Sequence, residues 1–151
     1  MMNTASGNEL SKTEYPPRQF PLKEVRITVL HQTGHGIPGS YRITITGDGK
    51  AVQAVDKNKR KEITLSKKQL VELINEFYRI HFFELPDSYG VQRHVVLMDD
   101  GTLRLFTGRL ADVASQQVCI EISDYKKCIT VINRHPLELR LLVDKMEALF
   151  K

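Results

Sequence analysis

The chain has 151 residues, of which 41% are hydrophobic and 26% are charged, and these proportions are ordinary for a globular protein. The length suits one domain with a real hydrophobic core. No apolar run approaches the roughly 18 residues of a membrane span, and the polar start lacks the basic and apolar regions of a secretory signal. We therefore expect a cytoplasmic protein without a membrane partner. The net charge of +4 permits contact with nucleic acid but does not argue for it.

The first part of the chain is polar and contains Pro16, Pro17 and Pro21. Polar segments of this kind bury too little apolar surface to fold by themselves. We expect a flexible N-terminal arm over residues 1–21 and a single folded domain over residues 22–151.

Alternating apolar and polar residues predict the first strands. Residues 24–31 alternate in this way, and so do residues 41–46 and 50–56 around the turn sequence of residues 47–49. An Asp-Gly turn between two such strands is the strongest hairpin signal in the chain. The expected inward-facing residues are Val25, Ile27, Val29, Tyr41, Ile43 and Ile45.

Two helices are predicted, at about residues 66–81 and 136–150. Ser66 and Gln69 have the spacing of a capping box, in which each side chain hydrogen-bonds a backbone N–H of the first turn. Pro136 suits the start of the second helix because the missing N–H costs nothing there. Apolar residues three and four positions apart follow in both segments. Between the first strands and the first helix, residues 57–61 read as a charged turn, and residues 62–65 as a short edge strand.

Two further hairpins are expected between the helices. Residues 91–97 and 102–106 flank the turn sequence Asp-Asp-Gly, and residues 117–122 and 127–133 flank Asp124. Hairpins imply an antiparallel sheet, and the order of strands, helix, strands and helix places both helices on one face. The predicted class is therefore α+β, a single domain.

The segment from Gly36 through the first helix to Tyr89 resembles an uncharacterised bacterial domain-of-unknown-function family. Its members share a Y-x-V-x-I-x-G-D-G hairpin, a helix and an F-F-x-L stretch that ends in tyrosine. The likeness covers roughly residues 30–150, with 90–115 as a local elaboration. The family's two cysteines would fall at Gly34 and Pro38, so any role of that pair is absent here. The resemblance implies the fold and no activity. The matching residues are Tyr41, Ile43, Ile45, Asp48, Gly49, Phe82, Phe83, Leu85 and Tyr89.

Cys119 and Cys128 lie on one face of the third predicted hairpin. In the cytoplasm we expect reduced thiols that pack as small hydrophobic side chains. A disulfide between directly paired strands looks geometrically awkward. As a nucleophile, either cysteine would need a base such as His94, and no local signature supports that.

No pattern establishes a metal site or a cofactor. His31 and His35 are four residues apart but on a strand and a loop, so a metal would need distant ligands such as the cysteines or His94. The carboxylates occur in turns, where Asp hydrogen-bonds its own backbone. No catalytic constellation is visible, which makes an enzyme the less favoured class.

Basic residues cluster before and within the first turn of the first helix. They would supply phosphate contacts without base readout, whereas the simplest interpretation is a solvated turn. The cluster consists of Lys57, Lys59, Arg60, Lys61, Lys67 and Lys68.

Three hypotheses for function follow. The preferred one is a non-enzymatic interaction or accessory domain that binds an unidentified protein or a second copy of itself, for example by strand addition to a sheet edge. The second is binding of nucleic acid or another anionic partner through the basic cluster. The third is a small-ligand or enzyme site beside the loop of residues 34–40, with His35, Tyr41 and Tyr89 as its residues.

Overall fold

A computed structural model describes residues 15–34, 36–56, 59–108, 114–132 and 136–151. In these residues seven strands form one sheet in the order β4-β3-β2-β1-β8-β9-β5. Every neighbouring pair is antiparallel except β5–β9. The strands are β1 (Val25–Gln32), β2 (Tyr41–Thr46), β3 (Lys50–Val55), β4 (Lys59–Thr64), β5 (Ser88–Tyr89), β8 (Ser115–Ile122) and β9 (Tyr125–Ile132).

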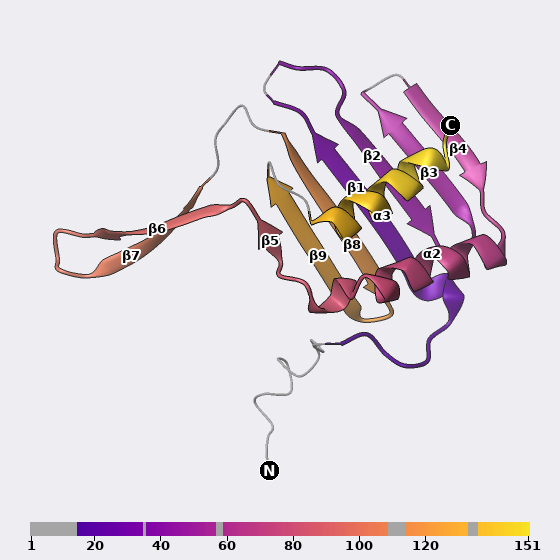
Figure 1. Cartoon of the computed structure of the whole chain (residues 1–151), viewed down its shortest axis with the longest axis horizontal. Coiled ribbons are helices and arrows are strands. Elements are labelled where there is room, and N and C mark those ends of the chain that lie inside the picture. The colour runs from indigo at the N-terminus through magenta and orange to yellow at the C-terminus, as the bar shows by residue number, and fades with distance from the viewer. Residues whose placement is uncertain (1–14, 35, 57–58, 109–113, 133–135) are drawn as a thin grey trace, which may run out of the picture.

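Two helices, α2 (Lys67–Arg79) and α3 (Leu137–Ala148), lie across the same face of this sheet (Figure 1). A separate two-stranded sheet, β6 (Gln92–Leu97) with β7 (Leu103–Gly108), extends away from it. Short 3-10 turns, η1 (Leu22–Glu24) and η2 (Phe82–Glu84), precede β1 and follow α2. The predicted α+β class, with both helices on one face, is confirmed.

The core lies between the helices and the inner face of the sheet. Each strand contributes alternate residues, so that Ile27, Ile43 and Ile120 have no exposed surface. The helices contribute their apolar stripes, including Phe77 of α2 and Leu139 of α3, which are also fully buried. The period-two and helical patterns of the sequence therefore describe two surfaces that pack against each other.

The β2–β3 turn and the start of α2 have the predicted local structure. Gly49 adopts a φ of 99°, in the left-handed region that a three-residue hairpin loop requires at this position. Ser66 Oγ accepts a hydrogen bond from the Gln69 N–H, and the Gln69 side chain accepts one from the Ser66 N–H. The capping box is thus complete.

Two local predictions were wrong. Residues 59–61 are not part of a charged turn, because they form the first half of edge strand β4. Ser88 and Tyr89 lie outside every predicted strand, whereas they form β5, which pairs with Thr130 and Val131 of β9.

The cysteines are also a correction, since Cys119 and Cys128 form a disulfide and are not reduced thiols. The register of β8 and β9 places them directly opposite each other, with Cα atoms 4.1 Å apart. So short a distance belongs to the non-hydrogen-bonded type of antiparallel pair, in which side chains approach most closely. Direct pairing, which had counted against a bridge, is here what brings the sulfur atoms together.

Candidate functional site

The β6–β7 hairpin carries a fully apolar patch on one of its faces. Register pairs Val95 with Leu105 and Leu97 with Leu103, so these four side chains share a face. We call them the aliphatic face. Their exposed fractions are 58%, 59%, 68% and 67% respectively. The hairpin packs mainly against itself, so no other described element covers this patch.

The opposite face of the hairpin is mixed in character. His94 stacks on Phe106 with ring centroids 5.9 Å apart, and Arg104 lies opposite Val96. Val96 and Phe106 are less exposed than the aliphatic face, at 38% and 39%. The two faces therefore differ, and only one of them lacks polar side chains between its apolar residues.

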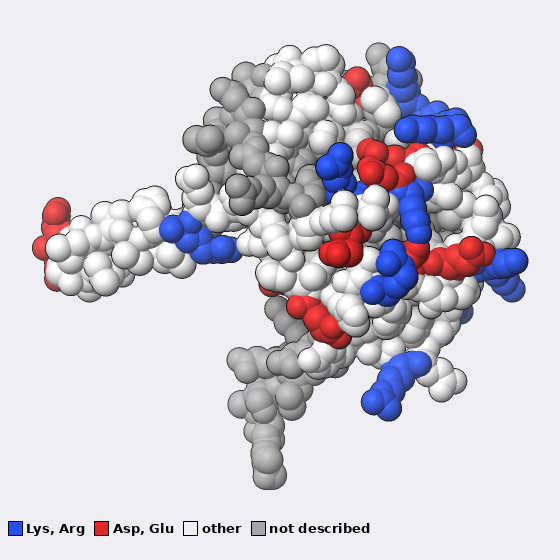
Figure 2. Space-filling view, in the orientation of Figure 1, with Lys and Arg blue, Asp and Glu red and all other residues white. Residues whose placement is uncertain are grey.

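Charges of opposite sign lie at the two ends of the hairpin. Asp99 and Asp100 form its tip, where Asp100 Oδ1 accepts hydrogen bonds from the N–H of Thr102 (2.9 Å) and its Oγ1 (2.6 Å). Both bonds lower the pKa of Asp100, and the bond from the hydroxyl has the larger effect. At the base, the Arg93 guanidinium donates to Ser88 Oγ at 2.9 Å. Figure 2 shows acidic side chains at the tip and basic side chains near the base.

A glycine fixes the point where the hairpin leaves the domain. Gly90 has a φ of 78°, and a Cβ atom at this position would lie 1.8 Å from the carbonyl oxygen of Ile132. Only glycine fits so close to the end of β9. The chain thus turns sharply from β5 into β6.

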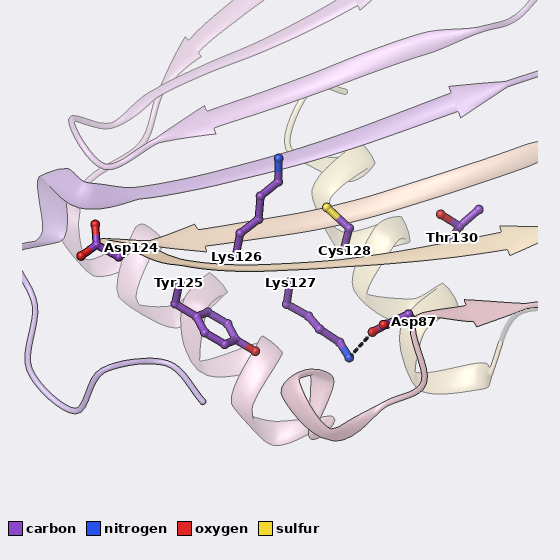
Figure 3. Close-up of a pocket in the computed structure, with 7 residues that line it drawn as sticks. All are labelled: Asp87, Asp124, Tyr125, Lys126, Lys127, Cys128 and Thr130. Carbon is purple, nitrogen blue, oxygen red and sulfur yellow. Dashed lines mark hydrogen bonds and ion pairs between the residues drawn. The ribbon is translucent and has the colours of Figure 1, made fainter. Parts of the chain in front are cut away.

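A second surface feature is the open part of the β9 edge. Beyond the short β5, a pocket of about 590 Å³ lies beside β9. Lys126, Cys128 and Thr130 point to one side of β9, whereas Tyr125 and Lys127 point to the other, where Lys127 is paired with Asp87 at 2.7 Å (Figure 3). The same lysine donates to the Leu85 carbonyl at 2.6 Å. These contacts close one flank of the edge.

A polar cluster lies between the sheet and α3, at the end of the buried face that is farthest from η1. The Tyr41 hydroxyl donates to Glu147 and accepts from Gln116 Nε2 at 3.2 Å, and the Tyr41 ring stacks on His31 with centroids 5.0 Å apart. Burial, followed by the bond to Glu147, raises the pKa of Tyr41 well above its usual value. The His31 Nδ1 atom is buried and has no hydrogen-bond partner in the described part of the chain. A cavity of about 310 Å³ adjoins the cluster, and Arg140 and Asp144 also line it.

The residues of the predicted ligand site are not gathered in one pocket. Tyr41 and Tyr89 lie in one row across the inner face, but β1, β8 and β9 separate their strands. Strands β2 and β5, which carry these two tyrosines, are therefore four strand spacings apart, or about 19 Å. Tyr89 has a raised pKa, caused by burial and then by Glu138. His35 lies outside the described residues.

Three residues of the basic cluster lie on edge strand β4 and are divided between its two faces. Alternation places Lys59 and Lys61 on the helix side and Arg60 on the other side, where it lies 3.7 Å from Glu62. Lys61 donates to the Phe150 carbonyl. Lys67 and Lys68 are exposed in the first turn of α2, and Lys57 lies outside the described residues. Charged side chains on an edge strand also prevent pairing with another chain.

The aliphatic face was not identified from the sequence. The alternation of residues 91–97 and 102–106 predicts a hairpin with an apolar face, but the same pattern is typical of a strand that packs on the core. The pattern contains no information on whether anything covers that face.

Comparison with models of known protein families finds no match, and comparison with curated proteins finds none either. No helix in the described ranges is long and apolar enough to cross a membrane. Within the same ranges, no group of three or more His, Cys, Asp or Glu residues is arranged to hold a metal ion.

Proposed function

We propose that this chain is a protein-interaction domain that binds through the aliphatic face of the β6–β7 hairpin. The observation that carries the proposal is the exposure of the four aliphatic side chains, each between 58% and 68%, on an element that projects from the body. Exposed apolar patches with polar surroundings mark sites of interaction. The seven-stranded sheet and its helices act as the platform that presents the hairpin.

The energetics of a free hairpin support this assignment. An isolated two-stranded hairpin is marginally stable in water and gains stability when it packs against another surface. Full burial of a Val or Leu side chain contributes about 1.5–3 kcal/mol relative to full exposure. Because the four side chains of the aliphatic face are more than half exposed, a partner that covers them would gain several kcal/mol, which offsets part of the free-energy cost of association.

A pair of charge-matched variants tests the proposal. Leu97→Asp with Leu105→Asp places two carboxylates in the aliphatic face. The control, Gln92→Asp with Val96→Asp, adds the same charge to the opposite face. In nuclease-treated native lysate, we expect tagged wild type and control to capture the same protein or to self-associate, and the aliphatic-face variant to do neither. Equal capture and self-association by all three proteins would contradict the proposal.

The basic cluster remains a weaker candidate for binding of nucleic acid. Lys59 and Lys61 point to one side of β4 and Arg60 points to the other, so these three residues do not form one continuous surface. Lys59→Ser, Arg60→Ser and Lys61→Ser together would reduce the affinity and its salt dependence if this hypothesis held.

The Tyr41 cluster is favoured as a second site because His31 lines a cavity and its Nδ1 has no hydrogen-bond partner among the described residues. It would suit a small ligand that donates a hydrogen bond to this nitrogen. A thermal-shift screen of hydroxyl- and amine-bearing metabolites should give stabilisation of wild type that His31→Phe abolishes. Equal stabilisation of both proteins would exclude the site.

A further inference from the structure

We propose that the partner of the hairpin is a second copy of this chain. The two hairpins are related by a two-fold axis, and their aliphatic faces are in contact. The tip of each hairpin lies over the base of the other. This inference rests on the proposed function and names its partner. Closed symmetric dimers are the commonest protein oligomers, and in them the same patch serves both subunits.

The aliphatic face is suited to contact with itself. Two cross-strand pairs, Val95–Leu105 and Leu97–Leu103, make an apolar area with no polar side chain between them. Six residues in each strand give a ribbon about 20 Å long. Two ribbons of the same length can therefore cover each other's aliphatic residues completely.

The charges at the two ends select the orientation. Arg93 lies on the same face as Val95, two residues closer to the base, whereas Asp99 and Asp100 lie at the tip. In the tip-to-base arrangement the acidic tip of each hairpin approaches Arg93 of the second copy, and symmetry forms this contact twice. A tip-to-tip arrangement would instead bring four carboxylates together, and like charges in contact oppose association. Figure 2 shows this separation of charge along the hairpin.

The second copy is favoured over an unrelated partner because this one element carries both halves of a complementary surface. The aliphatic face of one hairpin requires an apolar surface on the partner. Its acidic tip requires a basic group on the partner, one ribbon length away from that tip's own base. The hairpin itself supplies both when it is rotated by a half turn. Since few side chains make the contact, we expect a dimer that dissociates in the micromolar range or above.

Sedimentation velocity across a range of concentrations tests the proposal on the full chain. Wild type should shift from the 17.3 kDa monomer toward twice that mass as the concentration rises. Leu97→Asp with Leu105→Asp should remain monomeric, and unchanged circular dichroism and thermal midpoint should show that its body is folded. The Gln92→Asp with Val96→Asp control should dimerise as wild type does.

Charge reversal tests the orientation separately. Arg93→Glu alone, or Asp99→Lys with Asp100→Lys, should weaken dimerisation by about tenfold or more, because each places like charges in contact. The triple variant with both changes restores opposite charges and should recover most of the wild-type affinity. Ser88→Ala removes only the hydrogen bond from Arg93 and should dimerise normally.

The outcomes separate this inference from the function on which it rests. A wild type that stays monomeric up to millimolar concentration overturns the second copy as partner, and so does a triple variant that is no better than its parents. A dimer that persists in the aliphatic-face variant also overturns it. If the aliphatic-face variant fails to capture a protein that wild type captures from lysate, the interaction function stands with a different partner. If the variant behaves as wild type in both the capture and the sedimentation experiments, both proposals fail.

Discussion

Tyr41 contacts three other elements of the domain, two of them through its hydroxyl group. It lies on β2, stacks on His31 of β1, accepts from Gln116 of β8 and donates to Glu147 of α3. The hydroxyl therefore fixes α3 over the end of the sheet. A half-buried hydroxyl that bonds a carboxylate contributes more than an ordinary hydrogen bond.

Tyr41→Phe should lower the free energy of unfolding by about 1–2 kcal/mol at neutral pH, through loss of the charge-assisted bond. It should also change how the free energy of unfolding depends on pH in the alkaline range. Burial and Glu147 keep the Tyr41 pKa above its usual value of about 10. The unfolded chain therefore loses this proton first, and stability falls as pH rises above 10, by up to about 1.4 kcal/mol per pH unit.

Urea titrations at pH 7 and at intervals above pH 10 measure both effects. Because the variant lacks the group, its stability should fall less steeply than that of wild type above pH 10. Tyr15→Phe, which changes a tyrosine that is 61% exposed, is the control and should behave as wild type. Parallel curves for Tyr41→Phe and wild type in the alkaline range would contradict the explanation.

The Cys119–Cys128 disulfide closes a short loop, since the two cysteines are only nine positions apart in the sequence. On the chain-entropy account a loop of this size contributes about 2–3 kcal/mol by restricting the unfolded chain. Reduction, or Cys119→Ala with Cys128→Ala, should lower the free energy of unfolding by this amount. The variant should be insensitive to dithiothreitol.

Thiol titration of the denatured protein tests the bond itself. Protein purified without reductant should show no reactive thiol, and reduction should reveal both of its cysteines. Two thiols before any reduction would show that the cysteines are free after all.

At the scale of single elements, α2 depends on a local signal that was readable in the sequence. Ser66→Ala removes the side-chain acceptor of the capping box and should cost about 1 kcal/mol of unfolding free energy. Lys67→Ala, an exposed change in the next position, is the control and should have little effect. Chemical denaturation followed by far-UV circular dichroism measures the difference, and an unaltered midpoint for Ser66→Ala would refute the role of the cap.

Elements with a clear period or cap were predictable, whereas those defined by their partners were not. β2 and α2 carry alternation and a capping box in their own residues. β5 is two residues long and exists only because β9 offers backbone groups beside it. β4 begins with basic residues whose strand character comes from pairing with β3. Local patterns cannot report such tertiary pairing.

The candidate site divides in the same way. The hairpin of residues 91–106 was predicted, and so was its turn, but its detachment from the main sheet depends on Gly90 and on the end of β9. The sequence points to Tyr41 as a ligand residue but does not reveal its hydrogen-bond partners, since Gln116 and Glu147 lie on distant segments of the chain. Side chains that meet across the sheet and α3 leave no spacing signal in the sequence.

At the scale of the whole molecule, the domain combines a stable body with an element that is stabilised by little except its own pairing. The central strands β1 and β8 are paired on both sides and carry fully buried residues. Among the residues that the structure describes, nothing pairs with the two edges of the hairpin or covers its aliphatic face. We therefore expect very different free energies of local opening in the two parts.

Hydrogen exchange followed by mass spectrometry tests this difference and connects it to assembly. At low concentration, amides of β6 and β7 should exchange rapidly, while those of β1 and β8 are strongly protected. Raising the concentration should protect the hairpin of wild type, because a dimer stabilises the conformation that it binds. Edge strand β4 is the internal control, since its exchange should not depend on concentration.

The aliphatic-face variant, Leu97→Asp with Leu105→Asp, should lack this concentration dependence, whereas its β1 and β8 amides should be protected as in wild type. Strong protection of β6 and β7 at every concentration would mean that the hairpin is stable by itself and needs no partner. Protection of β4 instead of the hairpin would place the contact at the other edge of the sheet. A concentration effect confined to the hairpin is the result that the arrangement of free edges, apolar face and opposed charges leads us to expect.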